Sequence, residues 1–159
     1  MNPREMSIQT PPDEPVIRVQ RFFAGPPDLV FRAWTEPALL RRWWGPAGMT
    51  LAVCEIDLRV GGSYRFGYRT AGGAESGYGG RYLEIKPGVR LVYTAGFDIW
   101  PDRECVDALD FIAVTGGTLL SVVSTHQSIE LRDAHVNHGM ERGMRDNYRR
   151  LDEFLREEQ

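Results

Sequence analysis

The sequence predicts an α+β fold in which a strongly bent antiparallel sheet of about seven strands wraps one long C-terminal helix. Strand patterns separated by glycine-rich turns fill residues 49–127. A long amphipathic pattern follows at residues 138–157, and two short helical patterns come before the run of strands. One apolar sheet face and one apolar helix stripe must cover each other, so these patterns favour a single core between sheet and helix.

The length of 159 residues is enough to bury one sizeable core and too short for two ordinary domains. Residues 1–14 are polar, contain several prolines and show no periodicity, which predicts a flexible N-terminal tail. Residues 15–157 are then expected to form the single domain.

The first elements of this domain are one strand and two short helices. Residues 15–24 are rich in β-branched and aromatic side chains, as is typical of a strand. At residues 28–35 the apolar residues change to a helical period, and Pro37 ends that helix because it disfavours helical geometry in the residue before it. Residues 38–44 predict a second short helix, which stops at Gly45 and Pro46.

Six further strands are predicted as an antiparallel meander. They are expected at residues 49–60, 63–70, 75–86, 89–97, 104–114 and 118–127. In the second of these, Tyr64, Phe66 and Tyr68 occupy alternate positions and therefore share one face of the sheet.

The helix predicted at residues 138–157 has one apolar and one charged side. Its apolar stripe, with spacings of three and four residues, consists of Met140, Met144, Tyr148, Leu151 and Leu155. Opposite charges four residues apart support the exposed side in three pairs, which are Glu141 with Arg145, Asp146 with Arg150 and Asp152 with Arg156. Gly139 and Gly143 either leave room beside the two methionines or mark a frayed first turn.

Several classes of partner are excluded by charge and hydropathy. The net charge is −3 and no basic run is present, which argues against nucleic acid and anionic membranes. The N-terminus lacks the order of a signal peptide, and no apolar run is long enough to span a membrane, so we expect a cytoplasmic protein. Cys54 and Cys105 form no metal or redox motif and are expected to be buried as small apolar side chains.

Five segments of the chain carry a resemblance to a known family. They are WTEPALLRRWWGP at 34–46, DLRVGGSYRF at 57–66, GGRYLEIKPGVRLVYT at 79–94, GGTLLSV at 116–122 and HGMERGM…LDEFL at 138–155. In this order they resemble the activator of heat shock protein 90 ATPase homologue-like (AHSA-like) branch of the START-like, or SRPBCC, superfamily. The resemblance implies a helix-grip fold, in which sheet and long helix enclose an elongated cavity. Met144 departs from the pattern, because a tryptophan is usual at that position; the smaller side chain is expected to enlarge or reshape the cavity.

Aromatic and methionine side chains are the candidates for the wall of such a cavity, with simple core packing as the alternative. The candidate ligand-binding residues are Trp44, Phe66, Tyr68, Tyr82, Tyr93, Phe97, Trp100, His126, Met140, Met144 and Tyr148. Of the adjacent pair Trp43 and Trp44, one is expected to pack in the core and the other to lie near the cavity edge. His126 is expected at the cavity mouth, and His135 and His138 are expected to be solvated or to cap a helix.

No nucleophile–base pair, phosphate-binding loop or metal-ligand spacing is found in the sequence, so no catalytic residue, metal or cofactor is predicted. Arg69, Arg81 and Asp110 are ionisable residues within strands and are expected on the solvent face. An ionisable residue facing inward instead would be a candidate acid, base or anion anchor.

The leading functional hypothesis is a cofactor-free binding protein that holds a small apolar or aromatic molecule between sheet and C-terminal helix. One alternative, suggested by the family name, is a chaperone-associated interaction domain with a role in the stress response. A second is a cyclase- or hydrolase-like enzyme, as some members of the superfamily are. Converging ionisable side chains in the cavity would favour the enzyme, and a large exposed apolar patch the interaction domain. A monomer or weakly associated dimer is expected.

Overall fold

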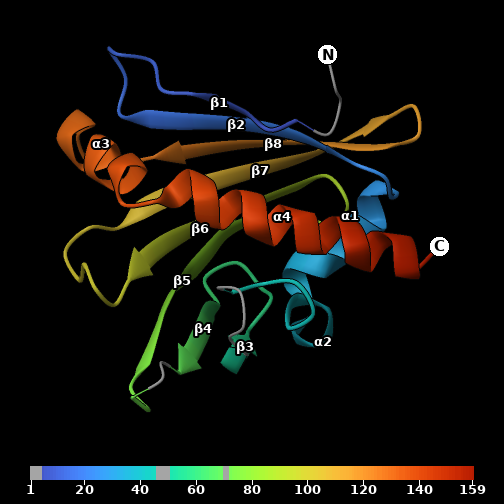
Figure 1. Ribbon diagram of the computed structural model, residues 1–159, viewed down its shortest axis with the longest axis horizontal. Helices are drawn as coiled ribbons and strands as arrows, with labels where there is room; N and C mark the ends of the chain where they lie inside the picture. The colour runs from blue at the N-terminus through green and yellow to red at the C-terminus, as the bar shows by residue number, and fades with distance from the viewer. Residues whose placement is uncertain (1–4, 46–50, 70–71) are drawn as a thin grey trace.

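A single antiparallel sheet of eight strands curves around the C-terminal helix in the computed structural model, which describes residues 5–45, 51–69 and 72–159 (Figure 1). The strands are β1 (Ser7–Gln9), β2 (Val16–Phe23), β3 (Leu51–Ile56), β4 (Ser63–Arg69), β5 (Glu75–Lys86), β6 (Arg90–Phe97), β7 (Cys105–Val114) and β8 (Gly117–Thr125). Their order across the sheet is β1-β2-β8-β7-β6-β5-β4-β3, so β3 to β8 form a meander and β2 pairs with β8. The predicted α+β helix-grip class is confirmed, with one strand more than expected.

Four helices accompany the sheet in the part of the chain that the structure describes. They are α1 (Pro27–Thr35), α2 (Pro37–Leu40), α3 (Ile129–Asn137) and α4 (Met140–Glu157). The helix α3 was not predicted from the sequence, because its apolar residues do not gather on one face. It is started by Ser128, whose side-chain oxygen accepts a hydrogen bond from the Leu131 backbone N–H at 3.1 Å. None of the described helices is both long and apolar enough to cross a bilayer.

The N-terminal segment is part of the fold, and the flexible tail expected at residues 1–14 is wrong for residues 5–14. Ile8 of β1 is the register partner of Val19 in β2, and Met6 is buried. Beyond β1, the side chain of Arg132 in α3 donates to the carbonyl oxygens of Pro11 and Glu14, both at 2.9 Å. The prolines at 11 and 12 lie in the turn after β1 rather than within its ladder, so they do not prevent strand pairing. Residues 1–4 lie outside the described residues.

The C-terminal half of α4 packs against the core. Leu151, Phe154 and Leu155 are buried, and Tyr148 packs edge-to-face on Phe23 of β2 with ring centroids 5.3 Å apart. Phe154 was missing from the predicted stripe. The N-terminal half is different, because its two methionines are only partly buried.

Ion pairs on α4 follow the predicted spacing in two cases and depart from it in the third. Glu141 pairs with Arg145, and Asp146 pairs with Arg150. Asp152 does not face Arg156; instead it forms two hydrogen bonds with Arg21 of β2, at 2.9 and 2.6 Å. Asp152 therefore lies on the side of α4 that faces the sheet, and the predicted pair is wrong.

Two other elements end more than two residues before the predicted position. The strand expected at 49–60 begins at Leu51 and ends at Ile56, and its first two expected residues lie outside the described part of the chain. The helix expected at 38–44 is confined to α2, after which the chain continues as a turn to Trp43. Trp43 is fully buried and its indole N–H donates to the Ala33 carbonyl at 3.0 Å. This side chain therefore holds the turn after α2 against α1.

Candidate functional site

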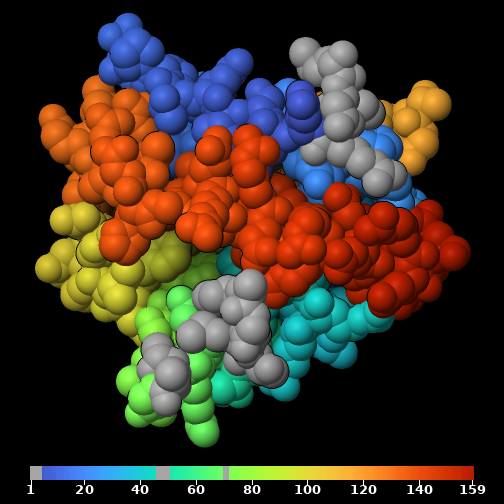
Figure 2. Space-filling model, viewed as in Figure 1, coloured from blue at the N-terminus to red at the C-terminus, as the bar shows by residue number. Residues whose placement is uncertain are grey.

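A cavity of about 460 Å³ lies between the concave face of the sheet and α4. Alternate residues of the strands form its floor, as the two-residue period of a strand requires. The floor consists of Ile17, Val19, Tyr68, Tyr78, Tyr93, Ala95, Phe97, Cys105, Asp107, Leu109, Val122 and Ser124. In Figure 2, α4 crosses the face of the molecule in orange and red, and the surface is hollowed between its N-terminal half and the yellow and green strands below.

The N-terminal half of α4 supplies the opposite wall, with Met140, Gly143 and Met144 among the lining residues. Gly139 is the N-cap of α4 and has φ of +86°, a left-handed conformation that glycine adopts without strain. A Cβ atom added to Gly143 would meet no described atom within 4 Å, so the helix borders open space at this point. Of the two interpretations of the glycines, room beside the methionines agrees with the geometry at Gly143, and Gly139 marks the start of the helix.

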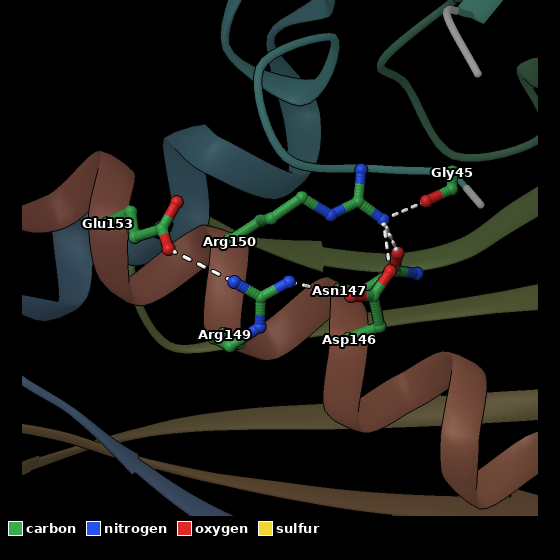
Figure 3. Close-up of polar contacts among 6 residues, drawn as sticks. All are labelled: Gly45, Asp146, Asn147, Arg149, Arg150 and Glu153. Atoms are coloured by element: carbon green, nitrogen blue, oxygen red, sulfur yellow. Dashed lines mark hydrogen bonds and ion pairs between the residues drawn. The ribbon is translucent and has the colours of Figure 1, made fainter. Parts of the chain in front are cut away.

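The rim nearest α2 is held by Arg150, as Figure 3 shows. Its guanidinium donates to the backbone carbonyl of Gly45, and it contacts Asp146 at 3.0 Å and Asn147 at 2.7 Å. Gly45, Asp146 and Asn147 all line the cavity, as does Trp44 next to them. Arg150 therefore joins α4 to the turn after α2 at the edge of the cavity.

One carboxyl group lies on the floor of the cavity, that of Asp107 in β7. Burial raises the pKa of this carboxyl group, while hydrogen bonds from Ser124 and Cys105 act in the opposite direction. Ser124 is its register partner on β8, and the Cys105 sulfur is 3.8 Å from its Oδ1. Among the described lining residues there is no lysine or arginine.

Asp107 was not among the residues predicted for the site, whereas Asp110 of the same strand was considered. Asp110 lies on the convex face, where its carboxylate accepts from Arg90 at 2.8 Å, and Arg69 and Arg81 are exposed, so the expected solvent face is confirmed for all three residues. A signal for Asp107 was present in the sequence, because it alternates with Leu109 and Phe111 of the same strand. A polar residue in phase with apolar ones faces the same side as they do.

Two of the three histidines lie elsewhere than expected. His135, which was expected to be solvated or capping, lines the cavity, and His126 does not. His138 also borders the cavity, but it is exposed and is the C-cap residue of α3, as expected. His126 lies behind His135, with ring centroids 5.1 Å apart. Burial lowers the pKa of His135 to about 4, with a smaller contribution from the other two histidines. The unpredicted helix α3 explains the difference, since it carries His135 over the end of the sheet.

Most of the predicted ligand-binding residues are brought together around the cavity. Those that line it are Trp44, Tyr68, Tyr93, Phe97, Trp100, Met140, Met144 and Tyr148. Phe66 and Tyr82 do not line it; they are buried on either side of Tyr64, with centroid distances of 5.0 and 5.4 Å. The expectation that one of the two adjacent tryptophans packs and the other lies at the cavity edge is confirmed by Trp43 and Trp44.

The polar side chains of the site do not form a nucleophile–base–carboxylate relay. The Ser124 hydroxyl lies 3.3 Å from His126 Nε2, but Asp107 adjoins the serine rather than the imidazole that such a relay would orient. Burial lowers the pKa of His126, which weakens it as a base. Within residues 5–45, 51–69 and 72–159, no three His, Cys, Asp or Glu side chains are grouped as a metal site would require.

Comparisons with known proteins place the chain in a family. The family model described as activator of Hsp90 ATPase homolog 1-like protein matches residues 24–156. A solved structure from Rhodobacter sphaeroides is similar at 30% identity and a TM-score of 0.86, over 95% of this chain and 97% of that one.

Two further solved structures are similar. One, from Chromobacterium violaceum, has 31% identity and a TM-score of 0.76, over 88% of this chain and 96% of that one. The other, from Nitrosomonas europaea, has 25% identity and a TM-score of 0.81, over 92% of this chain and 97% of that one. A comparison with curated proteins gave no match. Because the family model spans most of the sequence and the helix-grip fold agrees with it, the chain belongs to the activator of Hsp90 ATPase homolog 1-like family.

Proposed function

We propose that this protein binds a small, largely apolar or aromatic molecule in the cavity between the sheet and α4. The observation that supports the proposal is the cavity itself, whose volume of about 460 Å³ lies within the range of small-molecule sites. Protein interiors pack with few voids larger than a water molecule, so a space of this size beside the core is not an ordinary packing defect, which supports a binding role. Aromatic walls with a few polar groups are the usual lining of such sites.

The proposed contacts divide into a rigid and an adaptable side. Tyr93 and Tyr148 are buried aromatic side chains held by neighbouring rings, so they can orient a flat ligand. Met140 and Met144 are unbranched and partly buried, which lets them adjust to its shape. The remaining proposed contacts are Trp44, Tyr68, Phe97 and Trp100.

The test is to fill the cavity with a side chain that the family pattern accommodates. N-phenylnaphthylamine, an apolar dye that is uncharged at neutral pH, should bind the wild-type protein with an increase in fluorescence. Met144→Trp should weaken this binding about ten-fold or more, which corresponds to about 1.4 kcal/mol. Met144→Leu is the matched control, since it nearly conserves volume and should leave the affinity within about two-fold.

The two variants also show which part of the reasoning fails. If Met144→Trp has an unchanged melting temperature and binds the dye as tightly as wild type, the binding site lies elsewhere. If the wild-type protein does not bind the dye at all, the ligand-binding proposal is wrong.

A second candidate function rests on family membership. The family is named after an activator of the Hsp90 ATPase, so we propose as the alternative that this chain contacts a chaperone. Adding the purified protein to Hsp90 and measuring ATP hydrolysis tests this directly. A rate unchanged at saturating protein would remove the alternative.

A further inference from the structure

We infer that the ligand carries a protonated amine on its apolar body and that Asp107 is the counter-ion for this group. The inference rests on the proposed function and adds to it the charge of the ligand and the residue that recognises it. It comes from the contrast between one carboxyl group and the otherwise uncharged floor on which it lies.

Asp107 faces the cavity by strand geometry. It is two residues from Cys105 and from Leu109 on β7, and all three line the floor. Among the described residues, its side-chain hydrogen-bond partners are the hydroxyl of Ser124 and the thiol of Cys105, and a thiol is a weak donor. These are neutral groups, so they do not balance a negative charge.

No cationic side chain of the described lining supplies the missing charge. Lysine and arginine are absent from it, and the lowered pKa of His135 keeps that ring neutral at pH 7. The other lining histidine, His138, is exposed and has no effect on the pKa of Asp107. No positively charged residue contributes to the pKa of Asp107, whose rise has burial as its first cause. Asp107 is half-buried, and a carboxylate that is partly withdrawn from water is costly without a cation, since buried charges in proteins are usually paired. A cationic ligand would complete the pair.

The aromatic rings around Asp107 favour the same kind of ligand. Burial raises the pKa of the Tyr78, Tyr93 and Tyr148 hydroxyls, and the charge of Asp107 raises each of them further, so all three lie within its electrostatic field. Ring faces attract a cation, most strongly in a site from which water is excluded. An anionic ligand would meet this negative charge with no lysine or arginine among the described lining residues to balance it.

Three compounds with the same indole ring and different charges test the inference. Tryptamine is cationic at pH 7, tryptophol is neutral and indoleacetate is anionic, and each is small enough for the cavity. Isothermal titration calorimetry on the wild-type protein should give an affinity for tryptamine at least about ten-fold above that for tryptophol, because charge-assisted hydrogen bonds are the stronger kind. Indoleacetate should bind more weakly than tryptophol.

Asp107→Asn removes the charge while conserving the shape of the side chain. It should abolish the preference for tryptamine and leave the affinity for tryptophol within about two-fold. Asp110→Asn is the matched control, since it makes the same change on the opposite face of the same strand and should leave both affinities unaltered. If Asp107→Asn does not fold, the comparison of the three compounds on wild-type protein still decides the question.

The outcomes separate this inference from the function on which it rests. Equal binding of tryptamine and tryptophol by the wild-type protein would overturn the inference and leave the apolar binding site in place. Tighter binding of tryptophol or indoleacetate would also overturn it and would assign Asp107 the role of a neutral hydrogen-bond donor. Failure of all three compounds and of the uncharged dye to bind would overturn both proposals.

Discussion

Breaking the ion pair between Arg21 and Asp152 should destabilise the protein far more than breaking any surface pair. The two side chains join β2 to α4, with Nη1–Oδ1 and Nη2–Oδ2 distances of 2.9 and 2.6 Å. They are 8% and 14% exposed, so water solvates neither charge well. Arg21 also donates to the Phe22 carbonyl at 2.7 Å, and its guanidinium lies 4.7 Å from the ring centroid of Phe23.

The expected change in the free energy of unfolding follows from the groups that each substitution leaves without a partner. Asp152→Leu leaves a buried guanidinium without its carboxylate, a situation that costs about 3–5 kcal/mol in proteins. The contacts of Arg21 with Phe22 and Phe23 remain, so we expect the lower end, about 3 kcal/mol. The double variant Arg21→Met with Asp152→Leu replaces the pair by apolar side chains and should lie within about 1 kcal/mol of wild type. The coupling between the two sites should then be at least about 2 kcal/mol.

Urea denaturation at pH 7 measures these differences. As a control, Glu141→Ala removes the exposed pair with Arg145, whose charged atoms are 3.5 Å apart, and should cost no more than about 0.5 kcal/mol. A loss below about 1 kcal/mol for Asp152→Leu would refute the reasoning, because it would mean that Arg21 finds water or another partner without cost.

Three other predictions concern the packing of the fold and its pH dependence. Leu151→Ala should cost about 2–5 kcal/mol in the same denaturation assay, because Leu151 is fully buried in the stripe of α4; an unchanged midpoint would contradict that placement. Deleting residues 1–14 should lower the melting temperature by several degrees, since it removes β1 and buried Met6 and leaves Arg132 with fewer carbonyl partners. The pKa of His135 is lowered to about 4, so the unfolded chain takes up this proton first as the pH falls. Stability should therefore decrease from about pH 6.5 to 4, and His135→Gln should reduce that decrease in urea midpoints measured across the range.

The parts of the fold that the sequence predicts well are those whose patterns are local. The boundaries of β5 agree with the predicted residues 75–86, because glycine and proline end the alternation on both sides. The stripe of α4 is equally local, since spacings of three and four residues define a helical face without reference to the rest of the chain.

The elements that were missed depend on distant partners. The strand β1 is three residues long and exists as a ladder with β2, so its own sequence carries little signal. Arg132 shows the same dependence, because a charged residue in a short polar helix gives no sign that it will be buried against the carbonyls of residues 11–16. Asp152 was assigned to a neighbour on its own helix because sequence spacing cannot show that Arg21 lies opposite.

At the candidate site, prediction from sequence has a third limit, because it does not show which face of a strand is turned toward the helix. Asp107 and Asp110 lie on one strand, and an odd spacing between two residues puts them on opposite faces of the sheet. Their roles therefore depend on which set of alternate residues faces the helix. The apolar phase of Leu109 and Phe111 decides this for β7, but it becomes informative only once the strand is known to cover a cavity.

The helix α4 keeps its buried core contacts and the residues of the proposed binding site in different halves. Its C-terminal half carries Leu151 and Leu155 in the core and Asp152 in the buried pair. Its N-terminal half begins at a left-handed glycine and presents Gly143 and partly buried Met144 to the cavity. Arg150 lies between the halves and holds the helix against the turn after α2, so changes in the cavity wall need not loosen the core. Substitutions at position 144 should therefore alter ligand affinity with little change in stability, whereas those at position 151 should do the reverse.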